Sequence, residues 1–188
     1  MNRLANMRCY LCGPMDRAVD GGAGWRVDIQ NELRRYGLRF LDPCNKPTQK
    51  GIETPETRKL LNSEKLRGNF DFVATEMKWI RRVDLRMVHL ADFLIVHLDM
   101  DIHACGSYEE ITWANQEKKP ILVHVEQGKK QAPNWLFGMI PHNMIFSRWS
   151  EVFDYLEFIS CGSHAVRDWD ITEWSDNRWH LFDWMGDK

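Results

Sequence analysis

The sequence predicts a single α/β domain, in which helices cover both faces of a parallel sheet in a three-layer, doubly wound arrangement of the Rossmann or flavodoxin type. Two observations carry this prediction. Short apolar runs alternate with helical patterns along the chain, which is typical of parallel α/β folds. The run at 92–98 is apolar enough to be a strand buried on both faces. The 188 residues suffice for one sizeable core.

The first half of the chain supplies two strands and one helix. The apolar stretch 7–12 is a strand candidate that stops at a Gly-Pro pair. A helical pattern begins at Trp25 and is closed by Gly37, and a second strand at 38–43 ends in proline. Residues 44–56 contain two prolines and a glycine, so we expect a loop there.

The second half continues the alternation up to residue 160. Residues 57–90 are helical and charged, and we expect two helices broken near Gly68. The elements that follow are a strand at 92–98, a helix from 107 to about 118, a strand at 120–126, a short element at 133–140, a strand at 143–147 and a helix at 149–159.

Residues 161–188 are predicted to form a Trp-rich C-terminal extension of the 1–160 domain. Its tryptophans recur every five residues, a spacing that matches neither a helix face nor a strand face; they are Trp169, Trp174, Trp179 and Trp184. We expect an apolar tail that packs on the domain or on a partner subunit.

Composition limits the partners and the compartment. The formal charge of −2 gives no electrostatic reason to expect binding to a nucleic-acid polymer or to an anionic membrane. No apolar run has membrane-spanning length, and the first residues lack the apolar core of a signal peptide. Five cysteines cannot all pair with each other, so we expect reduced thiols and a cytoplasmic location.

Acidic residues crowd the segment DMDIHACGSYEE at 99–110, directly after the apolar strand. In parallel α/β sheets the ligand site lies at the carboxyl ends of the strands, so this segment and the loop at 13–24 are candidate binding loops. Ser107 and Glu110 fit a capping box, which would by itself explain both residues. The alternative is functional: a carboxylate kept ionised by the helix dipole suits a nucleophile. Retaining glycosyl transfer needs such a carboxylate and a second acid about 5–5.5 Å away.

Four stretches together resemble the nucleoside 2-deoxyribosyltransferase family. They are YLCGPM at 10–15, D-x7-D at 84–92, DMD-x4-GSxxE at 99–110 and the Lys-Pro-apolar strand downstream. The resemblance spans roughly residues 7 to 160. The family includes transferases that exchange bases on deoxyribose and relatives that hydrolyse nucleoside 5′-monophosphates. It therefore implies cleavage or transfer at an N-glycosidic bond through a glutamate-linked glycosyl intermediate, without a metal or organic cofactor.

The resemblance assigns three catalytic residues. The nucleophile falls on Glu110, which leaves Glu109 without a role, and the acid/base or base-binding aspartate falls on Asp84, 26 residues upstream. An Asp that delivers a proton needs a pKa raised by burial or by a neighbouring carboxylate. Tyr10 matches the tyrosine whose hydroxyl orients the nucleophile. The structural alternatives are an exposed ion pair of Asp84 with Arg81 or Arg82, and ordinary strand packing of Tyr10.

A departure from the family concerns the sugar site. Many members carry an acid six residues before the nucleophile, where it receives a sugar hydroxyl, and this chain has Ala104 there. The missing acid removes a repulsion toward a 5′-phosphate, which Arg17 and Ser107 would then bind. Asp99 or Asp101 is the alternative, as a replacement for the missing acid.

The remaining expected binding residues are Gly13, Gly106 and Asn134. Gly13 and Gly106 belong to the matching stretches. Asn134 lies near the position at which the family donates a polar residue from a neighbouring subunit, so the resemblance implies a homodimer or a higher homo-oligomer with shared sites. The substrate implied is a small nucleoside or nucleotide.

Other functions compete with this one. Cys9 and Cys12 could bind zinc with a third cysteine or a histidine, although a separation of three in a strand points them to opposite faces. The same pocket could serve a nucleotide sensor without turnover, or a glycohydrolase of another riboside such as NAD. Two acids near the sugar favour the enzyme over the sensor, because an anionic ligand gains nothing from them.

Overall fold

The computed structural model describes residues 2–161 and confirms the predicted α/β class. A five-stranded, wholly parallel sheet in the order β2-β1-β3-β4-β5 forms its centre. Its strands are β1 (Arg8–Cys12), β2 (Arg39–Leu41), β3 (Phe93–Leu98), β4 (Ile121–Val125) and β5 (Ile145–Phe146). This order is the flavodoxin-like one, in which the direction of winding reverses between β1 and β3.

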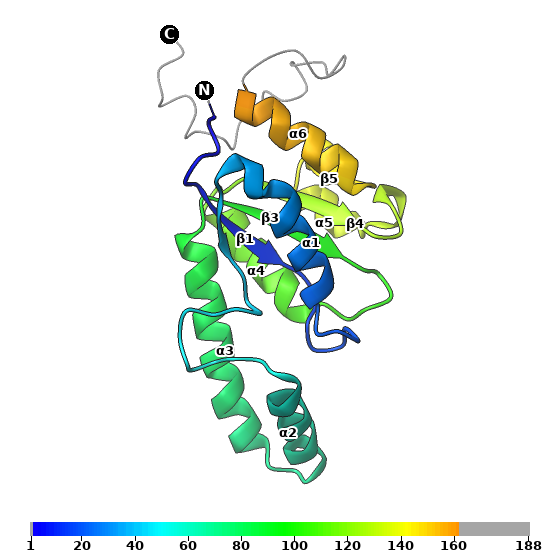
Figure 1. Ribbon diagram of the computed structural model, residues 1–188. Helices are drawn as coiled ribbons and strands as arrows, with labels where there is room; N and C mark the ends of the chain where they lie inside the picture. The colour runs from blue at the N-terminus through cyan, green and yellow to red at the C-terminus, as the bar shows by residue number, and fades with distance from the viewer. Residues whose placement is uncertain (1, 162–188) are drawn as a thin grey trace.

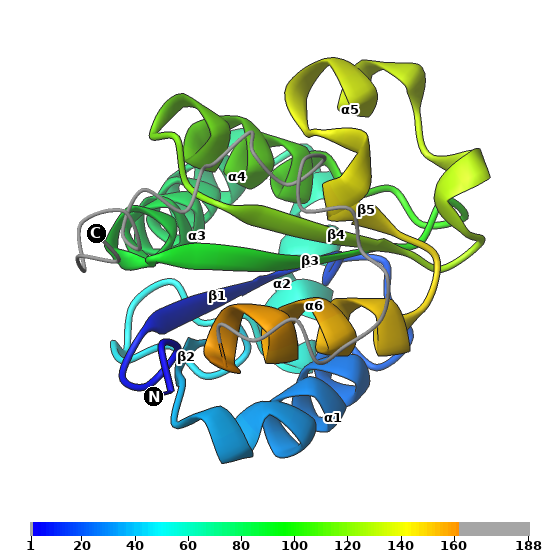
Figure 2. The same cartoon turned by 90° about the horizontal axis from the view of Figure 1, so that it is seen from above.

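Helices cover both faces of the sheet, as Figure 2 shows. One face carries α1 (Ala23–Leu33) and α6 (Trp149–Cys161); the other carries α3 (Phe70–Leu90), α4 (Cys105–Gln116) and α5 (Asn134–Met139). The further helical elements are α2 (Pro55–Leu66) and three 3₁₀ turns, η1 (Arg34–Tyr36), η2 (Lys129–Gln131) and η3 (His142–Met144). The three layers predicted from the alternating pattern are therefore present.

The core lies along the interior strands of the sheet and is most complete at β3 and β4. All five residues of β4 are buried, and in β3 only His97 retains partial exposure. Both strands lack the alternation of a half-exposed sheet because helices cover them on either side. Each buried Leu, Ile or Val stabilises the fold by roughly 1.5–3 kcal/mol relative to an exposed one.

The two helices predicted for 57–90 form an arm that projects from the sheet (Figure 1). The break between α2 and α3 falls at Gly68, whose φ of 79° lies in the left-handed region that glycine tolerates. α2 begins with a capping box between Thr54 and Thr57 and with Pro55 in its first turn. It buries none of its residues.

Two sequence-based expectations need comment. The helix predicted from residue 107 begins two residues earlier, at Cys105, so its N-cap is Ala104 and no side chain caps it. The extension 161–188 lies outside the described residues, apart from Cys161. Within residues 2–161, no helix has both the length and the apolar character needed to cross a bilayer.

Candidate active site

The candidate site lies at the carboxyl end of β1, beside the point where the winding of the sheet reverses. Tyr10 and Cys12 are two residues apart, so their side chains project to the same face of the sheet, which is the face covered by α3 and α4. Tyr10 donates a hydrogen bond of 2.8 Å to Oε1 of Glu110, which α4 supplies. Cys12 donates through its thiol to the Ser107 carbonyl at 3.6 Å. β1 and α4 are thus joined by these two contacts.

The pKa of Glu110 is raised to about 7. Burial is the main cause, and the charge of Asp84 adds to it, whereas the Cys12 thiol and the Tyr10 hydroxyl oppose it as hydrogen-bond donors. The expectation that the helix dipole would keep this carboxylate ionised is therefore wrong. Because α4 begins at Cys105, Glu110 lies beyond the first turn, where the dipole effect has faded.

Asp84 lies on α3 with 7% of its surface exposed and forms an ion pair of 2.7 Å with the buried ammonium of Lys46. Burial raises its pKa to about 6, although Lys46 acts in the opposite direction. The alternative of an exposed pair with a neighbouring arginine is excluded, because Arg81 instead forms a bidentate pair with Glu109. The two carboxyls of the predicted catalytic pair thus interact electrostatically and both titrate near neutral pH.

Sequence reasoning missed Lys46 and Glu53. Both come from the long loop before α2, and the Lys46 side chain is fully buried between Asp84 and Glu53, at 2.7 and 3.8 Å. Burial raises the pKa of Glu53. A lysine in a Pro- and Gly-containing loop gives no sequence signal of burial, because only the folded loop brings it against α3.

Arg26 is a second buried cation that the sequence did not reveal. It is 0% exposed, and its guanidinium donates to the carbonyls of Leu11 at 3.2 Å and Gly13 at 2.9 Å, and to that of Gly22. It therefore fixes the end of β1 to the start of α1. Its charge also favours the ionised forms of Asp84 and Glu110.

The predicted binding residues at the ends of β1 and α4 have distinct positions. Gly13 is buried, and a Cβ there would lie 2.8 Å from the Trp25 ring and 3.0 Å from the His97 carbonyl, so close packing requires glycine. Gly106 is exposed, with open space at its Cβ position. Ser107 is buried in the first turn of α4, so the predicted capping box is wrong. The helix starts too early for Ser107 to be its N-cap.

The other predicted binding residues lie in the segments that follow the strands. Arg17 is exposed in the loop between β1 and α1. Asp99 and Asp101 follow β3, and both accept hydrogen bonds from the Gln127 side chain, at 2.6 and 3.1 Å. Asn134 is the exposed first residue of α5. The structure thus brings together Tyr10, Asp84 and Glu110, whereas no described contact links Arg17 or Asn134 to them.

The proposed cysteine zinc site is not assembled. Cys9 and Cys12 are both buried; their thiols face the carbonyls of Tyr10 and Ser107. Among the described residues, one group of histidines and acids could hold a metal ion, and it contains neither cysteine.

The fold is similar to that of two solved enzymes. A 2-deoxyribosyltransferase from Bacillus psychrosaccharolyticus aligns over 79% of this chain and 95% of its own, with a TM-score of 0.51 and 17% identity. A 2-deoxyribosyltransferase from Leishmania mexicana aligns over 80% and 97%, with a TM-score of 0.50 and 15% identity. The sequence matches no family model and no curated protein. The chain has the fold of the 2-deoxyribosyltransferases, the family that its motifs resemble.

Proposed function

We propose that this chain is an enzyme that cleaves the N-glycosidic bond of a deoxynucleoside or its 5′-monophosphate and passes the sugar to a second base or to water. The observation that carries the proposal is the pairing of Glu110, hydrogen-bonded by Tyr10, with Asp84, a second carboxyl close enough to raise its pKa. A retaining glycosyl transfer requires two neighbouring carboxyls, one ionised as the nucleophile and one protonated as the acid, and a coupled pair that shares one proton can supply both.

In the proposed reaction, an ionised Glu110 oxygen attacks C1′ of the sugar while the bond from C1′ to the base nitrogen breaks. The electron pair of that bond leaves with the base, and Asp84 delivers the proton that neutralises it. Tyr10 holds Oε1 of Glu110 in place. In the second step, an acceptor base or water attacks C1′ and loses its proton to Asp84, while the bond between C1′ and the Glu110 oxygen breaks and releases Glu110 as a carboxylate.

The direct test is a panel of deoxynucleosides and 5′-monophosphates, incubated with the purified chain with and without a free acceptor base, with chromatography of the released base. Glu110-dependent release supports the proposal. Binding without release would contradict it and favour a nucleotide sensor. Release from NAD alone would favour a glycohydrolase of another riboside.

The pH profile of kcat/KM is expected to be bell-shaped, with its maximum between the pKa of Asp84, about 6, and that of Glu110, about 7. The reactive form carries one proton, on Asp84, with Glu110 ionised. Because the pKa of Glu110 lies above that of Asp84, this is the minor of the two singly protonated forms, and the rate falls on either side as the coupled pair gains or loses a proton. Measurements at constant ionic strength from about pH 5 to pH 9 would show it. A rate that climbs steadily over this range would contradict the assignment.

Asp84→Asn is expected to slow natural substrates by about 10²–10⁴-fold, the usual contribution of a general acid. Substrates whose base leaves without protonation should lose much less, because they need no proton. The matched control is Asp92→Asn, since Asp92 pairs with Arg8 at the opposite end of the sheet and its loss should leave both rates unchanged. Equal losses on both substrate types would leave Asp84 with a binding role only.

We further infer a preference for 5′-monophosphates, supported by Ala104 at the N-cap of α4 and by the absence of a side-chain cap there. Ala104→Asp should reverse or sharply reduce this preference, since two unit charges about 4 Å apart at an effective dielectric near 20 repel by roughly 4 kcal/mol. Ala104→Ser adds polarity without charge and should retain the preference. Ratios of kcat/KM for nucleoside and monophosphate measure it. A wild type that ignores monophosphates would disprove it and favour Asp99 or Asp101 as the hydroxyl acceptor.

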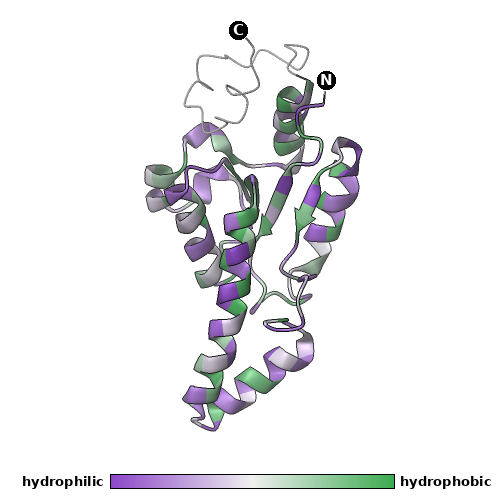
Figure 3. Ribbon diagram, turned by 90° about the vertical axis from the view of Figure 1, so that its left-hand side faces the viewer, coloured by the Kyte–Doolittle hydropathy of each residue, from purple (hydrophilic) through white to green (hydrophobic). Residues whose placement is uncertain are grey.

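We also propose that the chain forms a homo-oligomer. The support is the arm of α2 and α3, along which apolar and polar residues mix (Figure 3). Four of its large apolar side chains are exposed, Leu60, Leu66, Phe70 and Met77, and Ile52 is exposed in the loop just before α2. Several exposed apolar side chains on one pair of helices favour a partner surface that covers them.

A further inference from the structure

A second cluster of reactive side chains lies on the face of the sheet opposite to Glu110. His97 and His124 are cross-strand partners near the ends of β3 and β4. Glu126 follows His124 by two residues, so its side chain projects to the same side of the chain. Trp25 of α1 and Trp149 of α6 border the two imidazoles, which places the cluster under these helices.

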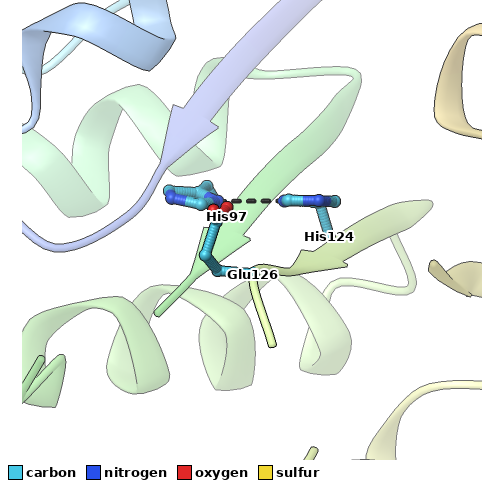
Figure 4. A group of neighbouring side chains, drawn as sticks. All are labelled: His97, His124 and Glu126. Carbon is cyan, nitrogen blue, oxygen red and sulfur yellow. Dashed lines mark hydrogen bonds between the residues drawn. The ribbon is translucent and has the colours of Figure 1, made fainter. Parts of the chain in front are cut away.

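The spacing of the three side chains suits one metal ion. The Nδ1 atoms of His97 and His124 are 3.0 Å apart, and one donor atom from each of the three residues lies within 4.8 Å of the others. Figure 4 shows the two rings edge to edge, with the Glu126 carboxylate beside His97. Ligand atoms about 2.0–2.1 Å from a tetrahedral Zn²⁺ lie roughly 3–3.5 Å from each other. The two nitrogens already have this spacing, and the exposed Glu126 carboxylate offers a third donor within 4.8 Å of both.

The surroundings hold the imidazoles in position. The His124 ring stacks on Trp149 with centroids 4.2 Å apart, and the His97 ring lies 5.2 Å from Trp25 and 5.7 Å from Trp149. His124 is 4% exposed. Rings that are locked by packing lose little entropy on binding an ion.

A hydrogen bond between two neutral imidazoles explains why His97 and His124 lie close together. It does not explain the position of Glu126, because such a bond needs one proton and no carboxylate. Within residues 2–161, the Glu126 side chain forms no hydrogen bond and no ion pair that would account for its place beside the histidines. The third donor, Glu126, is the observation that points beyond packing.

We propose that His97, His124 and Glu126 bind a divalent transition-metal ion, of which Zn²⁺ fits best. Two imidazoles and one carboxylate are a ligand set of zinc sites that keep a fourth position open. Imidazole nitrogen also suits Ni²⁺ and Cu²⁺, whereas Mg²⁺ and Ca²⁺ require oxygen ligands. The ion would tie the ends of β3 and β4 together beneath α1 and α6. The proposal revises the expectation that the chain holds no metal, and it is independent of the glycosidic reaction.

The test is a calorimetric titration of the tag-free full chain, treated with a chelator and dialysed, with Zn²⁺ alone. We expect one ion per chain at this site, no heat with Mg²⁺, and a melting temperature raised by Zn²⁺ because the ion binds only the folded state. Co²⁺ should give the visible absorption of a tetrahedral site. Glu126→Gln should weaken Zn²⁺ binding by about 100-fold or more, since even outer-shell partners contribute about 10–100-fold.

Variants show whether Zn²⁺ binds at this site or at other histidines of the chain. His97→Gln should weaken binding as Glu126→Gln does, while the exposed His103→Gln and His142→Gln should bind like the wild type. Because Glu126 is exposed, its variant is expected to fold even if a histidine variant does not. Absence of Zn²⁺ binding, or binding that Glu126→Gln leaves unchanged, would overturn the proposal.

Discussion

Replacing Glu110 by glutamine is expected to reduce turnover by about a thousandfold or more, the scale seen when an enzyme loses its nucleophile. Glutamine keeps the shape of the side chain and can still accept from Tyr10, but it cannot attack C1′. Single-turnover measurements of base release, with trapping of the glycosyl-enzyme in the wild type, would measure the loss. A Glu110→Gln variant that retained normal turnover would rule out the proposed nucleophile.

Glu109→Gln is the matched control, because Glu109 is the adjacent carboxylate of the same helix. It pairs with Arg81 at the surface, where the two side chains are 40% and 57% exposed, and surface pairs contribute about 0–1 kcal/mol. We expect most of the activity to remain. An inactive Glu109 variant beside an active Glu110 variant would show that the two roles are exchanged.

Stability separates a chemical loss from a folding loss. The pKa of Glu110 is raised from 4.5 to about 7 in the folded chain, so the native state binds this proton more tightly than the unfolded state does. The wild type should therefore lose stability as pH rises through this window, whereas Glu110→Gln should not. Thermal melting at acid and alkaline pH should show the variant to be relatively more stable at alkaline pH. A variant that melts earlier at every pH would point to a structural role.

Much of the fold could be predicted from the sequence, because its signals are local. Alternating apolar runs and helical patterns located the strands, and Gly68 located the break between α2 and α3. The pairing of Tyr10, Asp84 and Glu110 came from a resemblance of motifs rather than from periodicity. The start of α4 was misplaced because Ser107 and Glu110 satisfy a capping pattern that the backbone does not use.

Long-range burial could not be predicted. The side chains of Lys46 and Arg26 are fully buried, yet neither position carries a local signal of burial; Lys46 reaches Asp84 only through the folded loop, and Arg26 reaches the carbonyls at the end of β1 only once α1 packs there. The expectation that the helix dipole keeps Glu110 ionised was wrong because the sequence gives no measure of how deeply this carboxyl is buried. Burial decides the pKa of a carboxyl when the nearest helix end is more than one turn away.

Lys46→Met is expected to lower the free energy of unfolding by about 3–5 kcal/mol at alkaline pH, the cost of breaking a buried ion pair from one side. Methionine fills a similar volume but leaves the carboxyls of Asp84 and Glu53 without their cation. Their pKa values, already raised by burial, should rise further. Folding then binds protons that the unfolded chain releases, so the defect should grow with pH.

Denaturant unfolding of Lys46→Met at about pH 5 and pH 8 measures this dependence, with Lys50→Met as control. Lys50 lies in the same loop, but it is exposed over the Trp79 ring at 4.7 Å, a contact worth about 0.5–1 kcal/mol. Adding Asp84→Asn to Lys46→Met should restore part of the lost stability, since the amide needs no counter-charge. In Lys46→Met, the pH at which activity falls on the alkaline side should be higher, because Asp84 keeps its proton to a higher pH. Equal losses for Lys46→Met and Lys50→Met at alkaline pH would show that Lys46 does not hold the acids in their buried place.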